Sequence, residues 1–424
     1  MLSLQKIRKI MILNLEFKNF RSFKGCCSFT TEPTSSRAKP DNICKAATDA
    51  EGDKRALKIS LIFGANASGK TNIIKFMYGF RRWVLNIDNR VGEDIPLYMP
   101  FKFDSDTADA PIEFSIEFIT ANVRYKYTIK FERTKILVET LQSYPVGRPV
   151  LLYERMLLED DNESDSIKFG SSLTSNKSFN VFKNQLILSK FLKDTPCEPI
   201  TNAAKYLSGI VVSNGFHEDT MLGEDKEMLR WLYSHPDNRR MLSEFLSFAD
   251  TGVTDFRLEK RSDGVEASGL HGLYKDGKDI GESDLPMKEE SFGTRALFII
   301  GCNILQSLQN GSPFFVDEMD SGLHSHITQL IVDIFRNKRI NRNNAQLVFT
   351  THDVSLLDQN TIRKDQIWFT EKNKYGVSEI FSLSDFSDVR EDTLFGKWYL
   401  NNKFGGVPSL QPLEKLFADN GKEE

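Results

Sequence analysis

The sequence predicts an α/β fold: a mixed sheet with parallel strands, an antiparallel β-subdomain and a helical insertion. Three patterns predict it. From residue 290 onward, helical segments alternate with short apolar runs, as expected when crossover helices connect parallel strands. Residues 111–133 alternate apolar and polar side chains around Ala121-Asn122, which is typical of a β-hairpin. Residues 175–250 are mostly helical in pattern and show no sustained heptad, so we expect a compact arm and no coiled coil.

The first third of the chain begins with a strand. Residues 13–18 alternate so that Leu13, Leu15 and Phe17 share one predicted face. Residues 33–55 are rich in Pro, Ser, Thr, Lys and Asp and are expected to form a surface loop. A mostly apolar run at 58–63 predicts a strand buried on both faces, and a helix is expected from Thr71 to Trp83.

The last third supplies two further helix–strand pairs. Helices are predicted at 294–308 and 325–336, and buried strands at 313–316 and 346–350. The expected division of the chain is a first lobe at 1–170, a helical arm at 171–250 and a second lobe at 251–424.

Composition limits the class of protein. The chain has 40% hydrophobic and 27% charged residues, and no apolar run approaches the roughly 18 residues that a membrane helix needs. Its five cysteines lack metal-ligand spacing, which fits a reducing cytoplasm. The net charge of −4 does not indicate nucleic-acid binding. Such binding stays possible through local clusters, of which Arg336–Arg342 is the densest, although a solvated loop is the simpler interpretation.

A phosphate-binding loop follows the strand at 58–63. Residues 64–71, GANASGKT, match the pattern GxxxxGK[ST] between a buried strand and a helix, the context that the motif requires. In such a loop the backbone N–H groups surround the phosphates of ATP, the lysine contacts them, and the hydroxyl binds Mg²⁺. We therefore predict Mg-ATP as the ligand, with Thr71 as a metal ligand; the nucleotide-binding residues are Gly64, Asn66, Ser68, Gly69, Lys70, Thr71 and Asn72.

Two further strands end in polar residues suited to hydrolysis. The strand at 313–316 ends in Asp317, a predicted Mg²⁺ ligand, and Glu318, a predicted general base for the attacking water. The strand at 346–350 is followed by His352, which can donate a hydrogen bond to a γ-phosphate at the sheet edge where ligands bind. Thr351 and Asp353 beside it could equally cap a helix.

Ser291 and Gly293 open the helix at 294–308. A serine in this place is commonly just a cap. The order of phosphate loop, long insertion, Ser-x-Gly helix, acidic strand and histidine resembles the ABC-type ATPases, including SMC and RecF heads. The resemblance implies that Ser291 and Gly293 contact the γ-phosphate bound to a second copy. It also implies that Asp320 lines the dimer interface and that Arg21, in an NFRS segment, approaches the phosphates. No glutamine stands at the place of the family's Q-loop, which 99–102 occupy.

A narrower resemblance covers nearly the whole chain. The segments GANASGKTN, LPMKEESFGTRALF, VDEMDSGLHSHI, NAQLVFTTHDVSLLD and YLNNKFGGVP resemble AbiLi/RloA-like ATP-binding proteins of bacterial abortive-infection systems. This implies a role in defence against phage, in which the ATPase gates a separate effector such as a nuclease or another toxin. A cytoplasmic homodimer or higher oligomer is expected.

Two other functional classes remain open. A RecF- or SMC-like head would clamp DNA in repair or recombination, and would bind it through a basic groove with strong salt dependence. A transporter subunit would lack the arm at 171–250. A nuclease domain fused after the ATPase is not expected, because the residues after His352 contain no DxD motif.

Overall fold

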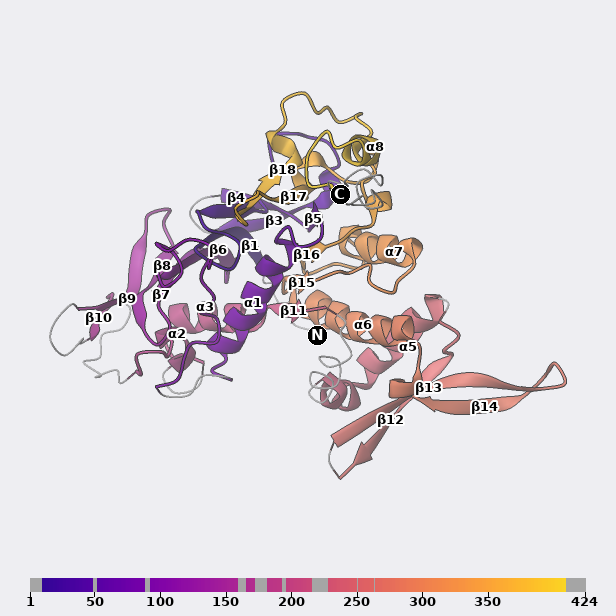
Figure 1. Ribbon diagram of the computed structural model, residues 1–424. Helices are drawn as coiled ribbons and strands as arrows, with labels where there is room; N and C mark the ends of the chain where they lie inside the picture. The colour runs from indigo at the N-terminus through magenta and orange to yellow at the C-terminus, as the bar shows by residue number, and fades with distance from the viewer. Residues whose placement is uncertain are drawn as a thin grey trace, which may run out of the picture.

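The computed structural model describes residues 10–48, 52–87, 92–158, 165–171, 181–192, 196–215, 228–249, 251–262 and 264–408. Two large sheets lie on either side of helix α1 (Lys70–Val84), and further helices cover the outer face of one sheet (Figure 1). The expected fold class, α/β with a mixed sheet that contains parallel strands and with an antiparallel β-subdomain, is confirmed.

The first sheet is antiparallel and has seven strands in the order β10-β9-β8-β7-β6-β1-β2. The predicted hairpin is confirmed, because Ala121 and Asn122 both have positive φ, 50° and 62°, between β6 and β7. This is the geometry that lets a two-residue turn follow the right-handed twist of the strands. The strands are β1 (Met11–Lys18), β2 (Cys27–Thr30), β6 (Ile112–Thr120), β7 (Val123–Phe131), β8 (Ile136–Tyr144), β9 (Val150–Leu157) and β10 (Asp165–Phe169).

The second sheet is mixed and carries the predicted motifs. Its order is β11-β15-β16-β5-β17-β18, and all neighbours are parallel except the edge pair β17 and β18. Parallel pairing brings the carboxyl ends of β5, β15 and β16 to one edge, where ligands bind in such sheets. The strands are β5 (Ile59–Gly64), β11 (Val211–Ser213), β15 (Phe314–Val316), β16 (Leu347–Thr350), β17 (Ile367–Lys372) and β18 (Ser378–Ser382).

Alternating side chains of this sheet pack into two cores. Ile62 faces α1 and the antiparallel sheet, whereas Leu61 and Phe63 face the opposite core. Burial on both faces explains why the strand reads as a nearly continuous apolar run. Helices α2 (Ile187–Lys190) and α3 (Glu198–Ser208) share the core of α1, and α6 (Phe292–Asn310), α7 (Ser325–Arg336), α5 (Pro236–Phe248) and α8 (Phe395–Leu400) contribute to the other.

A third sheet projects from the second lobe. Strands β12 (Asp255–Arg261), β13 (Gly264–Lys275) and β14 (Lys278–Pro286) form an antiparallel arm that extends away from the rest of the chain (Figure 1). The described helices of the predicted arm behave differently, since α2 and α3 pack into a core. Parts of 171–250 lie outside the described residues, so the three-part division of the chain stays a prediction.

Two local predictions are wrong. A register shift in β1 between Ile12 and Asn14 places Leu13 with Met11 in a small core against Cys44 and Ala56, away from Leu15 and Phe17. A bulge of this kind shifts the two-residue alternation, and the sequence carries no sign of it. The supposed loop at 33–55 contains most of a hairpin, β3 (Ile43–Thr48) and β4 (Gly52–Leu57), in which small and charged residues hid the strand character.

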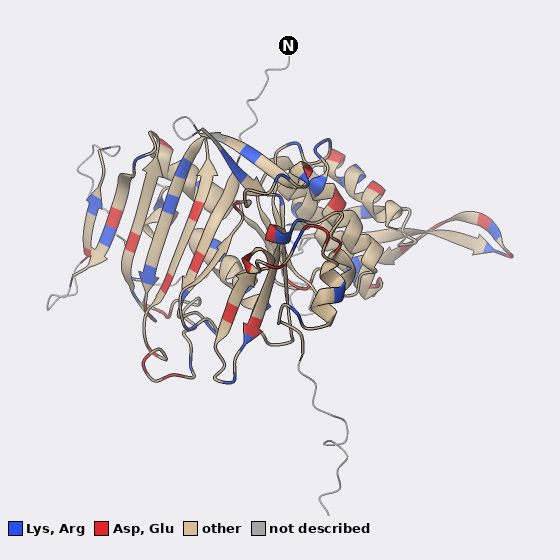
Figure 2. Cartoon of the chain, turned by 90° about the horizontal axis from the view of Figure 1, so that it is seen from above, with Lys and Arg blue, Asp and Glu red and all other residues tan. Residues whose placement is uncertain are grey.

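Charges are interspersed over the described surface. Figure 2 shows Lys and Arg alternating with Asp and Glu along the antiparallel sheet and on the projecting arm. Within the Arg336–Arg342 cluster, Arg336 pairs with Asp333 and Lys338 with Asp41. These pairs fit the solvated-loop interpretation of the cluster. None of the helices in the described ranges combines the length and hydrophobicity needed to cross a membrane.

Candidate nucleotide-binding site

The loop between β5 and α1 depends on two glycines with positive φ. Gly64 has φ 157° and Gly69 has φ 114°, and a Cβ atom on either would lie within 2.7 Å of a side-chain oxygen. For Gly69 that oxygen is Oγ of Ser378, at 2.7 Å. A residue with a side chain would therefore open the loop. The helix begins at Lys70, and its N-cap residue Gly69 provides no side-chain cap.

Hydroxyl groups brace this loop from neighbouring strands. The Ser68 and Thr370 hydroxyls lie 2.6 Å apart, and Ser378 Oγ donates to the Ser68 carbonyl at 2.6 Å. Asn72 Nδ2 donates to Ser22 Oγ at 2.7 Å, which fixes the first turn of α1 to the N-terminal segment. Thr370 and Ser378 were missed at the sequence level, since nothing near them in the chain indicates contact with a loop 300 residues away.

A cavity of about 580 Å³ opens beside the loop. Its lining includes the sequence candidates Arg21, Asn66, Ser68, Gly69, Lys70, Thr71 and Asn72, but not Gly64, and three further cations, Lys102, Arg133 and Lys372. Glu318 is the one carboxylate among the described residues that line it. Five cations against one carboxylate produce a positive potential that favours a polyanion such as a polyphosphate chain.

Lys70 folds back over the loop. Its Nζ donates to the carbonyls of Gly64 and Ala65 at 2.7 and 3.0 Å. Burial lowers its pKa below the ordinary value, while the nearby carboxylates of Asp317 and Glu318 oppose that shift. A desolvated ammonium close to a ligand interacts with negative charge more strongly than one in water.

Asp317 and Glu318 follow β15 and depend on one threonine of β16. Thr350 Oγ1 donates to Asp317 Oδ1 at 2.6 Å and accepts the N–H of Glu318 at 2.7 Å. Glu318 has φ 47°, an uncommon conformation for a residue with a side chain. Its side chain lines the cavity, so the backbone strain coincides with the place where a catalytic group is expected.

Asp320 and His352 lie near the same strand ends. The backbone N–H of His352 donates to the Asp320 carboxylate at 3.1 Å. Burial, and then the Lys70 cation, lower the pKa of His352, while Asp320, Glu318 and Asp317 raise it. These mutual effects show that the predicted groups from three separate motifs gather at one edge of the sheet.

The residues expected to hold magnesium have suitable chemistry. Asp317 is buried and offers a carboxylate, and Thr71 offers a hydroxyl within the first turn of α1. Magnesium prefers such oxygen donors and usually takes one or two carboxylates plus phosphate oxygens. Within the described ranges no group of three or more His, Cys, Asp or Glu could hold a metal ion.

Ser291 and Gly293 are placed differently. Ser291 Oγ accepts the Thr294 N–H at 3.1 Å and so caps α6. A Cβ on Gly293 would lie 2.9 Å from the carbonyl of Gly322, so the helix start packs closely on the turn after Asp320. Neither residue is among those that line the cavity of the same chain.

Arg21 is held by a tight turn. It has φ 50°, its N–H donates to the Met99 carbonyl at 2.7 Å, and its guanidinium contacts Met99 Sδ at 2.9 Å. Asn19 anchors the turn, because its side chain donates to the Ala110 carbonyl and accepts the Phe101 N–H. Met99 therefore positions Arg21 at the cavity, which both residues line.

The sequence profile of the family described as "AAA domain, putative AbiEii toxin, Type IV TA system" matches residues 59–187 and 221–358. The two stretches contain every predicted site residue except Arg21, and together exceed half of the chain. The chain belongs to this family. The ATPase family expected from the sequence, with its link to abortive-infection proteins, is thereby confirmed, and the family implies nucleotide binding by a P-loop ATPase.

Solved structures of SMC heads resemble the chain more distantly. The Smc head bound to the C-winged helix domain of ScpA has a TM-score of 0.45 and 16% identity, with 88% of this chain and 97% of that one covered. The SMC head domain from Thermotoga maritima has a TM-score of 0.38 and 17% identity, with 88% of this chain and 98% of that one covered. The Smc head domain with a coiled coil and joint from Pyrococcus yayanosii has a TM-score of 0.44 and 12% identity, with 93% of this chain and 99% of that one covered. No curated protein matches the chain.

Proposed function

We propose that the protein binds Mg-ATP and hydrolyses it between two copies of the chain, and that this cycle controls a separate effector. The observation that carries the proposal is the cavity at the phosphate loop, where five cations face a single carboxylate, Glu318. This distribution suits a polyphosphate together with a group that activates water.

The residues of one chain divide the chemistry between them. The loop N–H groups and Lys70 bind the phosphates, and Arg21, which lines the same cavity, adds positive charge. Thr71 and Asp317 would hold Mg²⁺, which neutralises phosphate charge. Glu318 accepts a proton from the attacking water, and His352, kept neutral by its lowered pKa, donates a hydrogen bond toward the terminal phosphate.

A second copy completes the site. Ser291 and Gly293 do not line the cavity of their own chain, and they sit at a helix start whose partial positive charge favours anions. We assign them to the γ-phosphate bound by the partner copy, with Asp320 at the interface between the two chains. The active unit is thus a homodimer or a multiple of it.

The biological role is proposed from family membership. The description of the family refers to a toxin and to toxin–antitoxin systems. Together with the resemblance to abortive-infection proteins, this supports a cytoplasmic switch that restrains or activates a partner effector during phage infection. The partner supplies the toxic chemistry, since the described site is suited to nucleotide hydrolysis.

The proposal predicts a closed dimer when hydrolysis is blocked. Glu318→Gln should bind ATP but lower turnover by about 10²- to 10⁴-fold, as loss of a general base does. Light scattering should then show its mass doubling on addition of Mg-ATP. The double variant with Lys70→Ala is the matched control and should stay at the lower mass. Unchanged turnover in Glu318→Gln would remove this residue from the base role, and an ATP-independent mass would exclude a nucleotide-driven dimer.

A further inference from the structure

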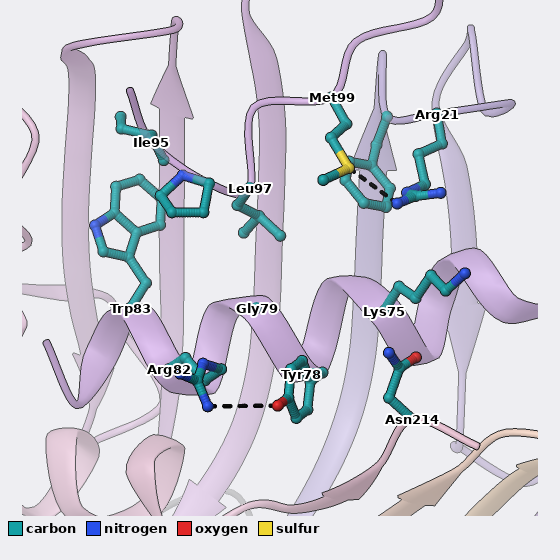
Figure 3. Close-up of a pocket in the computed structure, with 12 residues that line it drawn as sticks. Arg21, Lys75, Tyr78, Gly79, Arg82, Trp83, Ile95, Leu97, Met99 and Asn214 are labelled. Carbon is teal, nitrogen blue, oxygen red and sulfur yellow. Dashed lines mark hydrogen bonds between the residues drawn. The ribbon is translucent and has the colours of Figure 1, made fainter. Parts of the chain in front are cut away.

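A second cavity, of about 240 Å³, lies next to the nucleotide cavity. It runs along α1 under the segment 95–99 that follows this helix (Figure 3). Arg21 and Met99 line both cavities and form the wall between them. The lining comprises Phe20, Arg21, Lys75, Tyr78, Gly79, Arg82, Trp83, Ile95, Pro96, Leu97, Met99 and Asn214.

One end of this cavity is polar, and two polar atoms of the residues there have no hydrogen-bond partner in the part of the chain that the structure describes. Figure 3 shows Arg21, Lys75 and Asn214 at the same end of the helix. Nε of Arg21 and Oδ1 of Asn214 are buried, and neither has a hydrogen-bond partner in the part of the chain that the structure describes. Buried polar atoms without partners are costly and uncommon, so a donor and an acceptor left open at one cavity end indicate a ligand.

The other end is apolar and narrow. Trp83 donates its Nε1 proton to the Asn184 carbonyl at 3.0 Å, so its indole polar group is already satisfied outside the cavity. A Cβ on Gly79 would lie 2.6 Å from Leu97 Cδ1, so the glycine lets Leu97 approach the helix closely. Ile95 lies over the Trp83 ring in Figure 3. This end therefore favours a thin apolar group.

Charge selects the class of ligand. The cavity lining includes the cations Arg21, Lys75 and Arg82, and none of its described residues is acidic. Its volume lies just below the range of about 300–1,000 Å³ that is usual for drug-sized ligands, so a small molecule fits better than a polymer. An anionic group would meet Lys75 and Arg21 while an apolar body reached toward Trp83.

We propose that this cavity is a binding site for a small amphipathic anion, a flat apolar body carrying one acidic group, and that it regulates the nucleotide site. The acidic group of the ligand would contact Lys75 and the Arg21 guanidinium, and would thereby fix the arginine that lines both cavities. The regulatory part rests on the proposed function, whereas binding of the anion does not depend on it.

The test uses 8-anilinonaphthalene-1-sulfonate, whose fused rings and single sulfonate match this description. Its fluorescence should titrate to one molecule per chain. Lys75→Met, which keeps the length of the side chain but removes its charge, should weaken binding about tenfold or more, since hydrogen bonds to charged groups are among the stronger ones. Lys397→Met, at an exposed lysine of α8, is the matched control and should bind the probe normally.

Leu97→Trp provides a second variant, which should exclude the probe by filling the apolar end. Equal affinity in wild type and Lys75→Met, or full competitive displacement of the probe by ATP, would overturn the proposal, because the probe would then lie elsewhere. ATP binding is measured on the same preparations. If the wild-type protein binds the probe but not ATP, the proposed function is wrong and this inference stands. If it binds ATP but not the probe, this inference is wrong and the proposed function stands.

Discussion

Two helices of the molecule begin at motifs assigned to ATP, and their first turns differ. Helix α1 begins after Gly69, which has no side chain to cap it, and its first residues line a cavity rich in cations. Helix α6 begins after Ser291, which caps its own helix, and the motif packs against Gly322 of the same chain. No side chain caps the first helix start, whereas the Ser291 hydroxyl caps the second.

This difference indicates which helix start binds ATP and which contributes to its hydrolysis in the proposed dimer. An uncapped helix start gains stability when an anion binds its N–H groups. A capped helix start is stable without a ligand. Ser291 therefore does not require a phosphate from its own chain, and in the proposed dimer it contacts the phosphate bound to the second copy. Binding should therefore depend on the α1 region alone, whereas hydrolysis should require both regions.

The largest expected effect comes from Lys70→Ala. Removing the cation from the loop should reduce ATP affinity by about 100-fold or more, since several charge-assisted contacts to phosphate are lost together. The fold should survive, because Nζ bonds only to loop carbonyls in the described structure. Isothermal titration with ATP measures the change, with Lys397→Ala as control. Tight ATP binding by the Lys70 variant would contradict the assignment of ATP binding to the start of α1.

Substitution of Ser291 tests the other helix start. Ser291→Asp keeps an N-cap, so the stability should be unchanged, but the added negative charge should repel a phosphate and lower turnover at least about tenfold. Ser291→Ala should instead lose about 1 kcal/mol of stability together with the cap. Turnover assays and chemical denaturation separate the two effects.

Mixing the Ser291 and Lys70 variants should restore partial activity, and failure at every ratio would argue against a shared site.

Thr350→Val tests the support of the acidic residues. The change removes a donor to Asp317 and an acceptor for the Glu318 N–H, at an expected cost of about 1–3 kcal/mol, because a buried carboxylate and a backbone N–H lose partners. Urea denaturation measures this cost, and Thr361→Val, at a partly exposed threonine, is the control. A stable variant with normal turnover would show that Asp317 and Glu318 are held in place without the hydroxyl.

The smallest effect concerns the pH dependence of stability. Because burial and Lys70 lower the pKa of His352, the unfolded chain binds its proton more readily than the folded one. Stability from this source is complete above the ordinary pKa of about 6.5 and decreases as the pH falls below it. The change should be small, since the side chain is half-exposed. Unfolding free energies of wild type and His352→Gln should diverge between pH 7.5 and about 5.5, and parallel curves would contradict the shift.

Local sequence patterns predicted those elements whose side chains repeat with a single period. The helix at 325–336 and the strand pairs around Ala121-Asn122 agree with the structure within a residue or two. The phosphate loop, the acidic strand end and His352 could be placed at one sheet edge because parallel strands align their carboxyl ends. The pattern failed at Leu13, where one extra residue changed the face, and at 43–57, where the two strands have large apolar residues only at their paired ends, Ile43 and Leu57.

The sequence alone thus determined the fold class, the ATPase family and the groups that gather at the sheet edge, because these depend on short motifs and on regular alternation. Only the tertiary structure decided which distant side chains complete the site. Thr370 and Ser378 brace the loop, Lys102, Arg133 and Lys372 add to its charge, and Met99 and Arg21 separate two cavities. The hydrogen bonds from Thr370 and Ser378 to Ser68 join residues 302 and 310 positions apart, and they follow from how the sheets pack and from no local pattern in the chain.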